Sequence, residues 1–288
     1  MMSTLILTLL ALGAFAANSL LTRLALGAHA IDAASFTAIR LAAGAVALVA
    51  IVGVRDRSLS PLSSSSHRGI GRALGPAALF GYALPFSLAY LRIGAAVGAL
   101  VAFGTVQTAM IGYGLARGER PSPTAWLGIG IAGGGLVVLM LPSVGRPDPI
   151  GVVLMMTAGI AWAAYTIAGR ASRDPIAENA RSFVWSSVPA LLVAAARPAT
   201  LAVTPRGLGL ALVSGAVTSG IGYAVWYRAL PRLSVTQAAV AQVCTPLIAS
   251  AGAVVLLGER LSPRLALCGA AILVGVALVV RAPRRAAS

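Results

Sequence analysis

A few polar side chains lie inside long apolar runs of this sequence, where each of them needs a partner. Asn18 lies near the middle of the first run, Arg40 within the second and Gln242 within the ninth. An amide both donates and accepts hydrogen bonds, and a guanidinium binds a carboxylate through parallel N–H groups. Polar groups at membrane depth are costly and commonly mark a binding site. We therefore expect these three side chains to bind a small polar molecule, although Arg40 has the alternative of extending its guanidinium to the lipid headgroups.

Aromatic side chains recur in the same apolar runs and would supply surfaces for stacking. An aromatic residue near the end of a run usually anchors the chain at the membrane interface. The deeper residues are better candidates for a cavity wall, together with one tryptophan beside them. These candidates are Tyr82, Trp162, Tyr165, Tyr223 and Trp226.

The sequence offers no arrangement for covalent or metal-dependent catalysis. His29 and His67 fall in predicted loops, and the acidic residues fall in loops or at the edges of apolar runs. No nucleophile with a neighbouring base and no set of metal ligands is therefore expected. The chain also has no lysine, the residue that completes a phosphate-binding loop. We predict neither an enzyme nor a bound metal or cofactor.

The composition indicates that lipid surrounds most of the chain. Hydrophobic residues make up 58% of the sequence and charged residues only 10%, against roughly 25% charged residues in soluble domains. The net charge of +15 comes from arginines that fall between the apolar runs. A nucleic-acid-binding protein would gather such charge on one soluble face, so we expect no nucleic-acid partner.

Ten apolar segments are long enough to cross a membrane, which needs about 20 residues for a helix. They cover residues 4–26, 33–54, 73–92, 95–116, 124–142, 150–169, 181–197, 207–228, 233–257 and 264–281. The expected fold is an all-α membrane protein with ten transmembrane helices. Arginines are more numerous in the loops after the even-numbered segments and at the C-terminus. This bias places both termini in the cytoplasm.

Two motifs occur twice in the chain. AFAANSLLTR at 14–23 is similar to AWAAYTIAGR at 161–170, and GERPSP at 118–123 returns as GERLSP at 258–263. Five segments per half is an odd number, so the second half enters the membrane from the opposite side. We predict two inverted five-helix repeats, residues 1–145 and 146–288. Such repeats are typical of transporters with a substrate site at the midplane, and a membrane scaffold or receptor is the alternative.

Glycine, serine and proline mark the expected ends and bends of the helices. Gly118 suits the end of one helix, and Ser122-Pro123 suits the start of the next. Pro85 and Pro246 lie inside apolar segments and remove a helical hydrogen bond. We expect these two prolines to supply bends for gating.

With these motifs, the sequence resembles the EamA-type members of the drug/metabolite transporter superfamily along its whole length. Phe15 to Arg23 is similar to the family's first-helix pattern and Arg40 to its second-helix arginine. The second half adds Ala229-Leu230, Thr245-Pro246, Gly258 to Ser262 and Gly275. Phe15 replaces the usual Trp, and Val106 stands where the second copy has Pro246.

The resemblance implies a multi-pass transporter of a bacterial inner membrane that works by alternating access through a central cavity. The family exports amino acids, nucleobases, other metabolites and cationic compounds. The aromatic candidates and Arg40 suit a zwitterion with an apolar side chain, and the sequence is similar to the amino-acid exporter branch, including exporters of aromatic amino acids.

Efflux of cationic drugs and transport of nucleobases are the alternatives, and the lack of carboxylates within the segments disfavours a cation. The same lack predicts transport without a proton relay through a buried carboxylate. We expect the partners to be the lipid bilayer and a small molecule, and the chain to be a monomer or a weak homodimer.

Overall fold

The computed structural model describes residues 2–58, 71–141, 147–196, 202–257 and 262–282. Within these ranges the chain is helical, and its extended contact is an isolated bridge between Ile31 and Val203. The helices are α1 (Met2–Leu26), α2 (Ala33–Asp56), α4 (Gly71–Ala116), α5 (Pro123–Met140), α6 (Pro149–Gly169), α7 (Pro175–Ala195), α8 (Pro205–Val213), the π-helix η3 (Ser214–Ile221), α9 (Gly222–Ala229), the 3-10 turn η4 (Leu230–Arg232), α10 (Val235–Ala241), α11 (Cys244–Leu257) and α12 (Pro263–Arg281). The predicted domain boundary at 145/146 falls outside the described residues.

Seven of the described helical stretches are long and apolar enough to cross a membrane. One of them, Ala73–Ala116, contains two predicted segments, because Gly94 has a non-helical φ of 69° that divides α4 into two arms. The predicted ninth segment is split between α10 and α11, so neither part has the length of a span. The membrane-spanning character of the chain is thus confirmed, whereas the ten-helix inverted repeat stays a prediction.

The outer surface of the bundle is apolar. Val54, Val255, Leu267 and Val46 have exposed fractions of 82%, 80%, 73% and 70%. Within the apolar helices, polar side chains such as those of Asn18, Arg40 and Gln242 are buried instead, which inverts the arrangement of a soluble protein. Lipid is the solvent that suits such a surface, and helices suit lipid because they satisfy their own backbone.

The expected helix ends are present where the structure describes them. Gly118 has a φ of 85°, and Ser122 caps the next helix by accepting from the Ala125 N–H at 3.2 Å. Glu119 of the same motif has a role that the sequence did not indicate. Its carboxylate accepts from the N–H groups of Val235 and Thr236 at 2.7 and 3.1 Å, so it ties the end of α4 to the start of α10.

The seventh helix begins earlier than predicted and carries a buried acid. α7 starts at Pro175, six residues before the predicted segment, because Asp174 caps it. The expectation that Glu178 lies in a loop is therefore wrong. Its side chain is buried in the first turn of α7 and forms an ion pair with Arg181.

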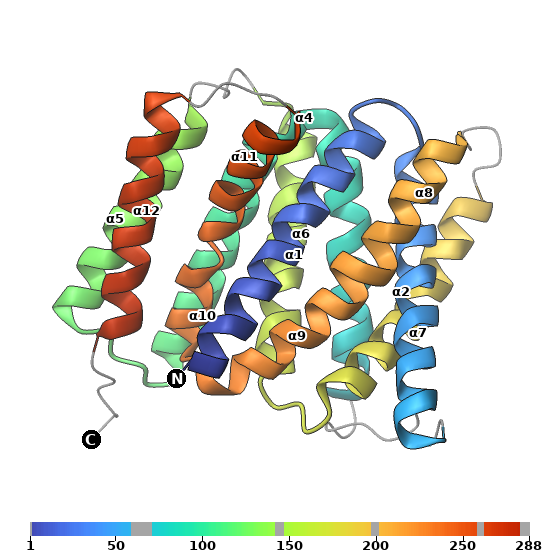
Figure 1. Ribbon diagram of the computed structural model, residues 1–288, viewed down its shortest axis with the longest axis horizontal. Coiled ribbons are helices and arrows are strands. Elements are labelled where there is room, and N and C mark those ends of the chain that lie inside the picture. The colour runs from blue at the N-terminus through green and yellow to red at the C-terminus, as the bar shows by residue number, and fades with distance from the viewer. Residues whose placement is uncertain (1, 59–70, 142–146, 197–201, 258–261, 283–288) are drawn as a thin grey trace.

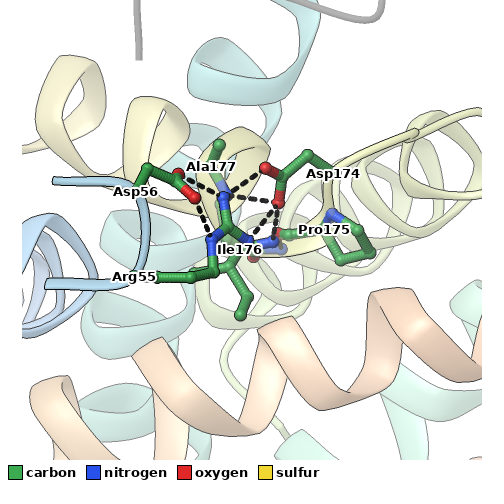
Figure 2. Close-up of polar contacts among 7 residues, drawn as sticks. Arg55, Asp56, Asp174, Pro175, Ile176 and Ala177 are labelled. Atoms are coloured by element: carbon green, nitrogen blue, oxygen red, sulfur yellow. Dashed lines mark hydrogen bonds and ion pairs between the residues drawn. The ribbon is translucent and has the colours of Figure 1, made fainter. Parts of the chain in front are cut away.

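An ion-pair cluster joins the end of α2 to the start of α7. Figure 2 shows the Arg55 guanidinium between the carboxylates of Asp56 and Asp174. Arg55 donates to both oxygens of Asp174 at 3.0 and 2.5 Å. This contact and the backbone N–H groups of Ile176 and Ala177 hold the pKa of Asp174 below its ordinary value.

Helices α5 and α12 pack side by side at one edge of the bundle (Figure 1). Their backbones meet at Gly128 and Gly275, where a Cβ on either glycine would lie 2.6 Å from the carbonyl oxygen of the other. Small residues allow this close approach between membrane helices. The two helices therefore pack closely on each other.

Candidate substrate cavity

A cavity of about 210 Å³ lies among α1, both arms of α4, α6, α9 and α11, with Met140 at the end of α5 also in its lining. Its α1 residues run from Phe15 to Arg23, in the half of that helix away from the N-terminus. Figure 1 shows α1 rising from the labelled N-terminus, so the cavity occupies the opposite half of the bundle. Among the described residues, the lining contains no Asp, Glu or His.

Aromatic rings from three helices meet at Trp162. The ring centroids of Phe15, Tyr82 and Tyr223 lie 5.3, 4.9 and 4.8 Å from that of Trp162. These are distances at which aromatic pairs attract beyond the burial of their area. All four side chains line the cavity. The structure therefore brings together Tyr82, Trp162 and Tyr223 from the predicted set.

Gln242 forms the polar part of the same wall. Its Oε1 accepts from the indole N–H of Trp162 at 2.6 Å, and its Nε2 donates to the carbonyl of Ala238 at 3.1 Å. Gln242 lies at the break between α10 and α11, four residues before Pro246. A proline ring clashes with the carbonyl four residues earlier, which accounts for a break at this position.

Asn18 lines the cavity and is oriented by the π-helix η3. Its Oδ1 accepts hydrogen bonds from Ser214 at 2.7 Å and from Thr218 at 3.4 Å. The amide oxygen of Asn18 is thus the acceptor of two hydroxyl groups. The NH₂ group of Asn18 is then the part that remains for donation into the cavity.

Arg40 lies behind the cavity wall and is only 1% exposed. Its Nε donates to Ser219 at 2.8 Å and its Nη2 to the Tyr223 hydroxyl at 2.6 Å. The guanidinium carbon lies 5.5 Å from the centre of the Tyr82 ring. The alternative that Arg40 reaches the headgroups is therefore wrong, because the guanidinium is held in the interior.

Two predicted cavity residues lie elsewhere. Tyr165 is fully buried and donates to Asn179 at 2.6 Å, and Trp226 is fully buried with its ring 5.7 Å from that of Phe15. Neither side chain is part of the lining. Of the two prolines, Pro246 lines the cavity, whereas α4 continues as a helix through Pro85 and is interrupted only at Gly94.

The residues that sequence reasoning missed are the hydroxyls of η3. Ser214, Thr218 and Ser219 hold Asn18 and Arg40 in place. η3 can lie this close because a Cβ on Gly215 would be 2.2 Å from the Arg40 carbonyl oxygen. π-helical turns are frequent at functional sites. The sequence feature that could have indicated these hydroxyls is the run SGAVTSG, whose small and hydroxylated residues interrupt an apolar segment.

An apolar helical bundle around a cavity with oriented polar groups is typical of membrane transport proteins. Residues 149–281 match the EamA-like transporter family. An uncharacterized protein of Pseudomonas aeruginosa is 46% identical over 281 residues, 98% of this chain and 95% of that protein. The uncharacterized transporter YwfM of Bacillus subtilis is 28% identical over 69% of each chain. The chain belongs to the EamA-like transporter family.

A further relative agrees with this assignment, and a solved structure shares the fold. An uncharacterized transporter of Archaeoglobus fulgidus is 27% identical over 57% of this chain and 59% of that protein. A protein crystal structure has the same fold, with a TM-score of 0.80 over 98% of this chain and 99% of that chain, at 22% identity. The chain is a multi-pass membrane protein of a small-molecule transporter family, with the lipid bilayer as its surroundings.

Proposed function

We propose that the protein exports amino acids, including aromatic ones, by alternating access between the repeats 1–145 and 146–288. The proposal rests mainly on the composition of the cavity wall. Aromatic rings gather around Trp162, hydrogen-bond groups of Asn18 and Gln242 lie among them, and Arg40 lies behind Tyr82 and Tyr223. Such a wall suits a flat apolar side chain joined to a polar, negatively charged end.

The proposal places the chain in a bacterial inner membrane with both termini in the cytoplasm, as a monomer or a weak homodimer. The cavity lies in the half of the bundle away from the N-terminus. In the proposed orientation this is the outer half, and we propose that an exported molecule is released on this side. Gln242 and Pro246, at the helix break, are the residues about which we propose that the cavity closes.

We propose that transport proceeds without a proton relay through a buried carboxylate. Glu178 is the acid that bears on this proposal, because it is buried in α7. It is ion-paired with Arg181 and is not part of the cavity lining. The test is uptake by the wild type and by Glu178→Gln, each with and without an imposed pH gradient. We expect similar rates in all four conditions, and strict dependence on the gradient would refute this part.

Efflux of cationic drugs is the second candidate function. The aromatic rings favour it, because a ring face attracts a cation. The arginines oppose it, since Arg23 contributes to the lining and Arg40 lies over the Tyr82 ring. A planar nucleobase would also stack on these rings, so it belongs in the same screen.

The experiment is transport by the purified chain in liposomes with labelled amino acids, a nucleobase and a quaternary ammonium ion. We expect flux of amino acids that Trp162→Ala abolishes. Trp185→Ala is the matched control, because that tryptophan is 61% exposed on the outer surface. Flux of the quaternary ammonium ion alone, or equal loss in both variants, would contradict the proposal.

A further inference from the structure

Arg40 is a buried cation that no described carboxylate neutralises. Its side chain is 1% exposed, and its hydrogen-bond partners among the described residues are the hydroxyls of Ser219 and Tyr223, not carboxylates. Burying an isolated charge is costly, and buried charges are normally paired. Because burying this guanidinium costs free energy, we expect it to have a partner at another stage of the transport cycle.

The hydrogen bonds of Arg40 leave part of its capacity unused. A guanidinium has five N–H donors. Nε donates to the Ser219 hydroxyl and Nη2 to the Tyr223 hydroxyl, both of which are neutral acceptors. Nη1 is buried and has no hydrogen-bond partner among the described residues. The two hydrogen bonds therefore hold the guanidinium in place, but these neutral acceptors do not neutralise its positive charge.

Tyr223 connects this charge with the cavity. Its oxygen accepts from Arg40 at 2.6 Å, which leaves the phenolic O–H to donate. A hydroxyl that accepts from a guanidinium is polarised and becomes a stronger donor to an anion. Tyr223 and Tyr82 both line the cavity, and both are in contact with the guanidinium.

We infer that Arg40 and Tyr223 make the cavity selective for molecules that carry a carboxylate. Tyr223 donates its O–H to the carboxylate, and Arg40 is a positioning residue that fixes the phenol and supplies the positive potential. This inference rests on the proposed amino-acid transport and names the chemical group that the site recognises. The Ser219 contact and the close approach of Gly215 hold Arg40 at the required place.

A purely structural role of Arg40 would affect all ligands alike, so the readout is discrimination between two matched ligands. The probes are 3-phenylpropionate and 3-phenylpropanol, which share the ring and the chain length and differ in the carboxylate. Each is measured as a competitor of labelled phenylalanine uptake by the full chain in liposomes. We expect the wild type to prefer the acid by about 10- to 100-fold, the size of a hydrogen bond to a charged group.

Variants assign the preference to residues. Tyr223→Phe and Arg40→Gln are expected to reduce it to about threefold or less, and Arg40→Lys to retain part of it, because the charge remains. Arg23→Gln tests the arginine that lines the cavity, and Arg92→Gln is the control, since Arg92 is exposed and is not part of the lining. Loss of the preference in Arg23→Gln, with full retention in Tyr223→Phe, would overturn the inference. Tyr223→Phe keeps the test decisive even where Arg40→Gln does not fold.

The inference and the proposed function fail in different ways. Phenylalanine uptake with an acid preference that neither Arg40→Gln nor Tyr223→Phe changes would overturn the inference alone. Absence of amino-acid uptake beside uptake of a quaternary ammonium ion would overturn both. Equal competition by sodium chloride at matched concentration would identify an inorganic-anion site, which also overturns recognition of a carboxylate.

Discussion

The indole Nε1 of Trp162 donates a hydrogen bond of 2.6 Å to Oε1 of Gln242. This bond joins α6 to the break between α10 and α11, and both side chains are buried at the cavity wall. The indole also contacts the rings of Phe15, Tyr82 and Tyr223. One polar pair therefore fixes the orientation of the ring around which the aromatic wall is built.

Gln242→Leu is expected to destabilise the protein, because it leaves the buried Trp162 N–H without an acceptor. A buried donor without a partner costs about 1–3 kcal/mol. The double variant Trp162→Phe with Gln242→Leu removes both groups and should recover part of that stability. Thermal unfolding in detergent of both single variants and the double variant measures this coupling. Strictly additive losses would mean that the bond does not contribute.

Gly215→Ala is expected to separate η3 from α2. The added Cβ would lie 2.2 Å from the carbonyl oxygen of Arg40, so the backbones must move apart. Forced overpacking of this kind costs about 1–3 kcal/mol, which thermal unfolding would register. Gly209→Ala on α8 is the control, because no atom lies within 4 Å of its Cβ position. That change should be neutral or stabilise by about 0.5–1 kcal/mol.

Acid should weaken the contact between α2 and α7. The Arg55 guanidinium and two backbone N–H groups lower the pKa of Asp174, so its carboxylate stabilises the fold above the ordinary pKa of about 4. This contribution is lost as the pH falls through the lowered value. Asp174→Asn should therefore reduce the melting temperature at pH 7, and by less as the pH is lowered toward 2. An equal difference at both pH values would be inconsistent with this assignment.

Glu119→Ala should loosen the first turn of α10. It removes the acceptor of the Val235 and Thr236 N–H groups and of the Thr236 hydroxyl. Hydrogen exchange at these two amides should rise by about 10-fold or more, since a hydrogen bond to a charged group contributes about 1.5–3 kcal/mol. Ser122→Ala, at the neighbouring cap, should change exchange at Ala125 instead. Unchanged exchange at Val235 in Glu119→Ala would refute the expectation.

The apolar segments and the helix ends could be predicted from the sequence, because both depend on local residue types. The cap at Ser122 and the positive φ of Gly118 follow from single residues. The meeting of Trp162 and Tyr223 could be anticipated from their depth in the segments. Their contact with substrate stays a prediction.

The arrangement around Arg40 could not be predicted, because it depends on packing between distant parts of the chain. Nothing in the second segment indicates that Tyr82 and Tyr223 cover the guanidinium. The early start of α7 was missed because charged residues around Glu178 reduce its hydropathy, although they are buried in an ion pair. A hydropathy scale scores each residue by its own type and takes no account of the partner with which it forms an ion pair.

The number of residues in the π-helix η3 decides which side chains of this segment face outward and which face Asn18 and Arg40. The exposed apolar side chains of this segment are Leu208, Leu212, Val213, Val217 and Ile221, and Leu212 is separated from Val217 by a step of five residues. The step of five carries one residue more than an α-helical turn, and one residue corresponds to about 100° of rotation. A deletion of one residue would turn Ser214 away from Asn18 or Ser219 away from Arg40, even with every side chain type retained. The number of residues in this segment is therefore as important to the site as their types.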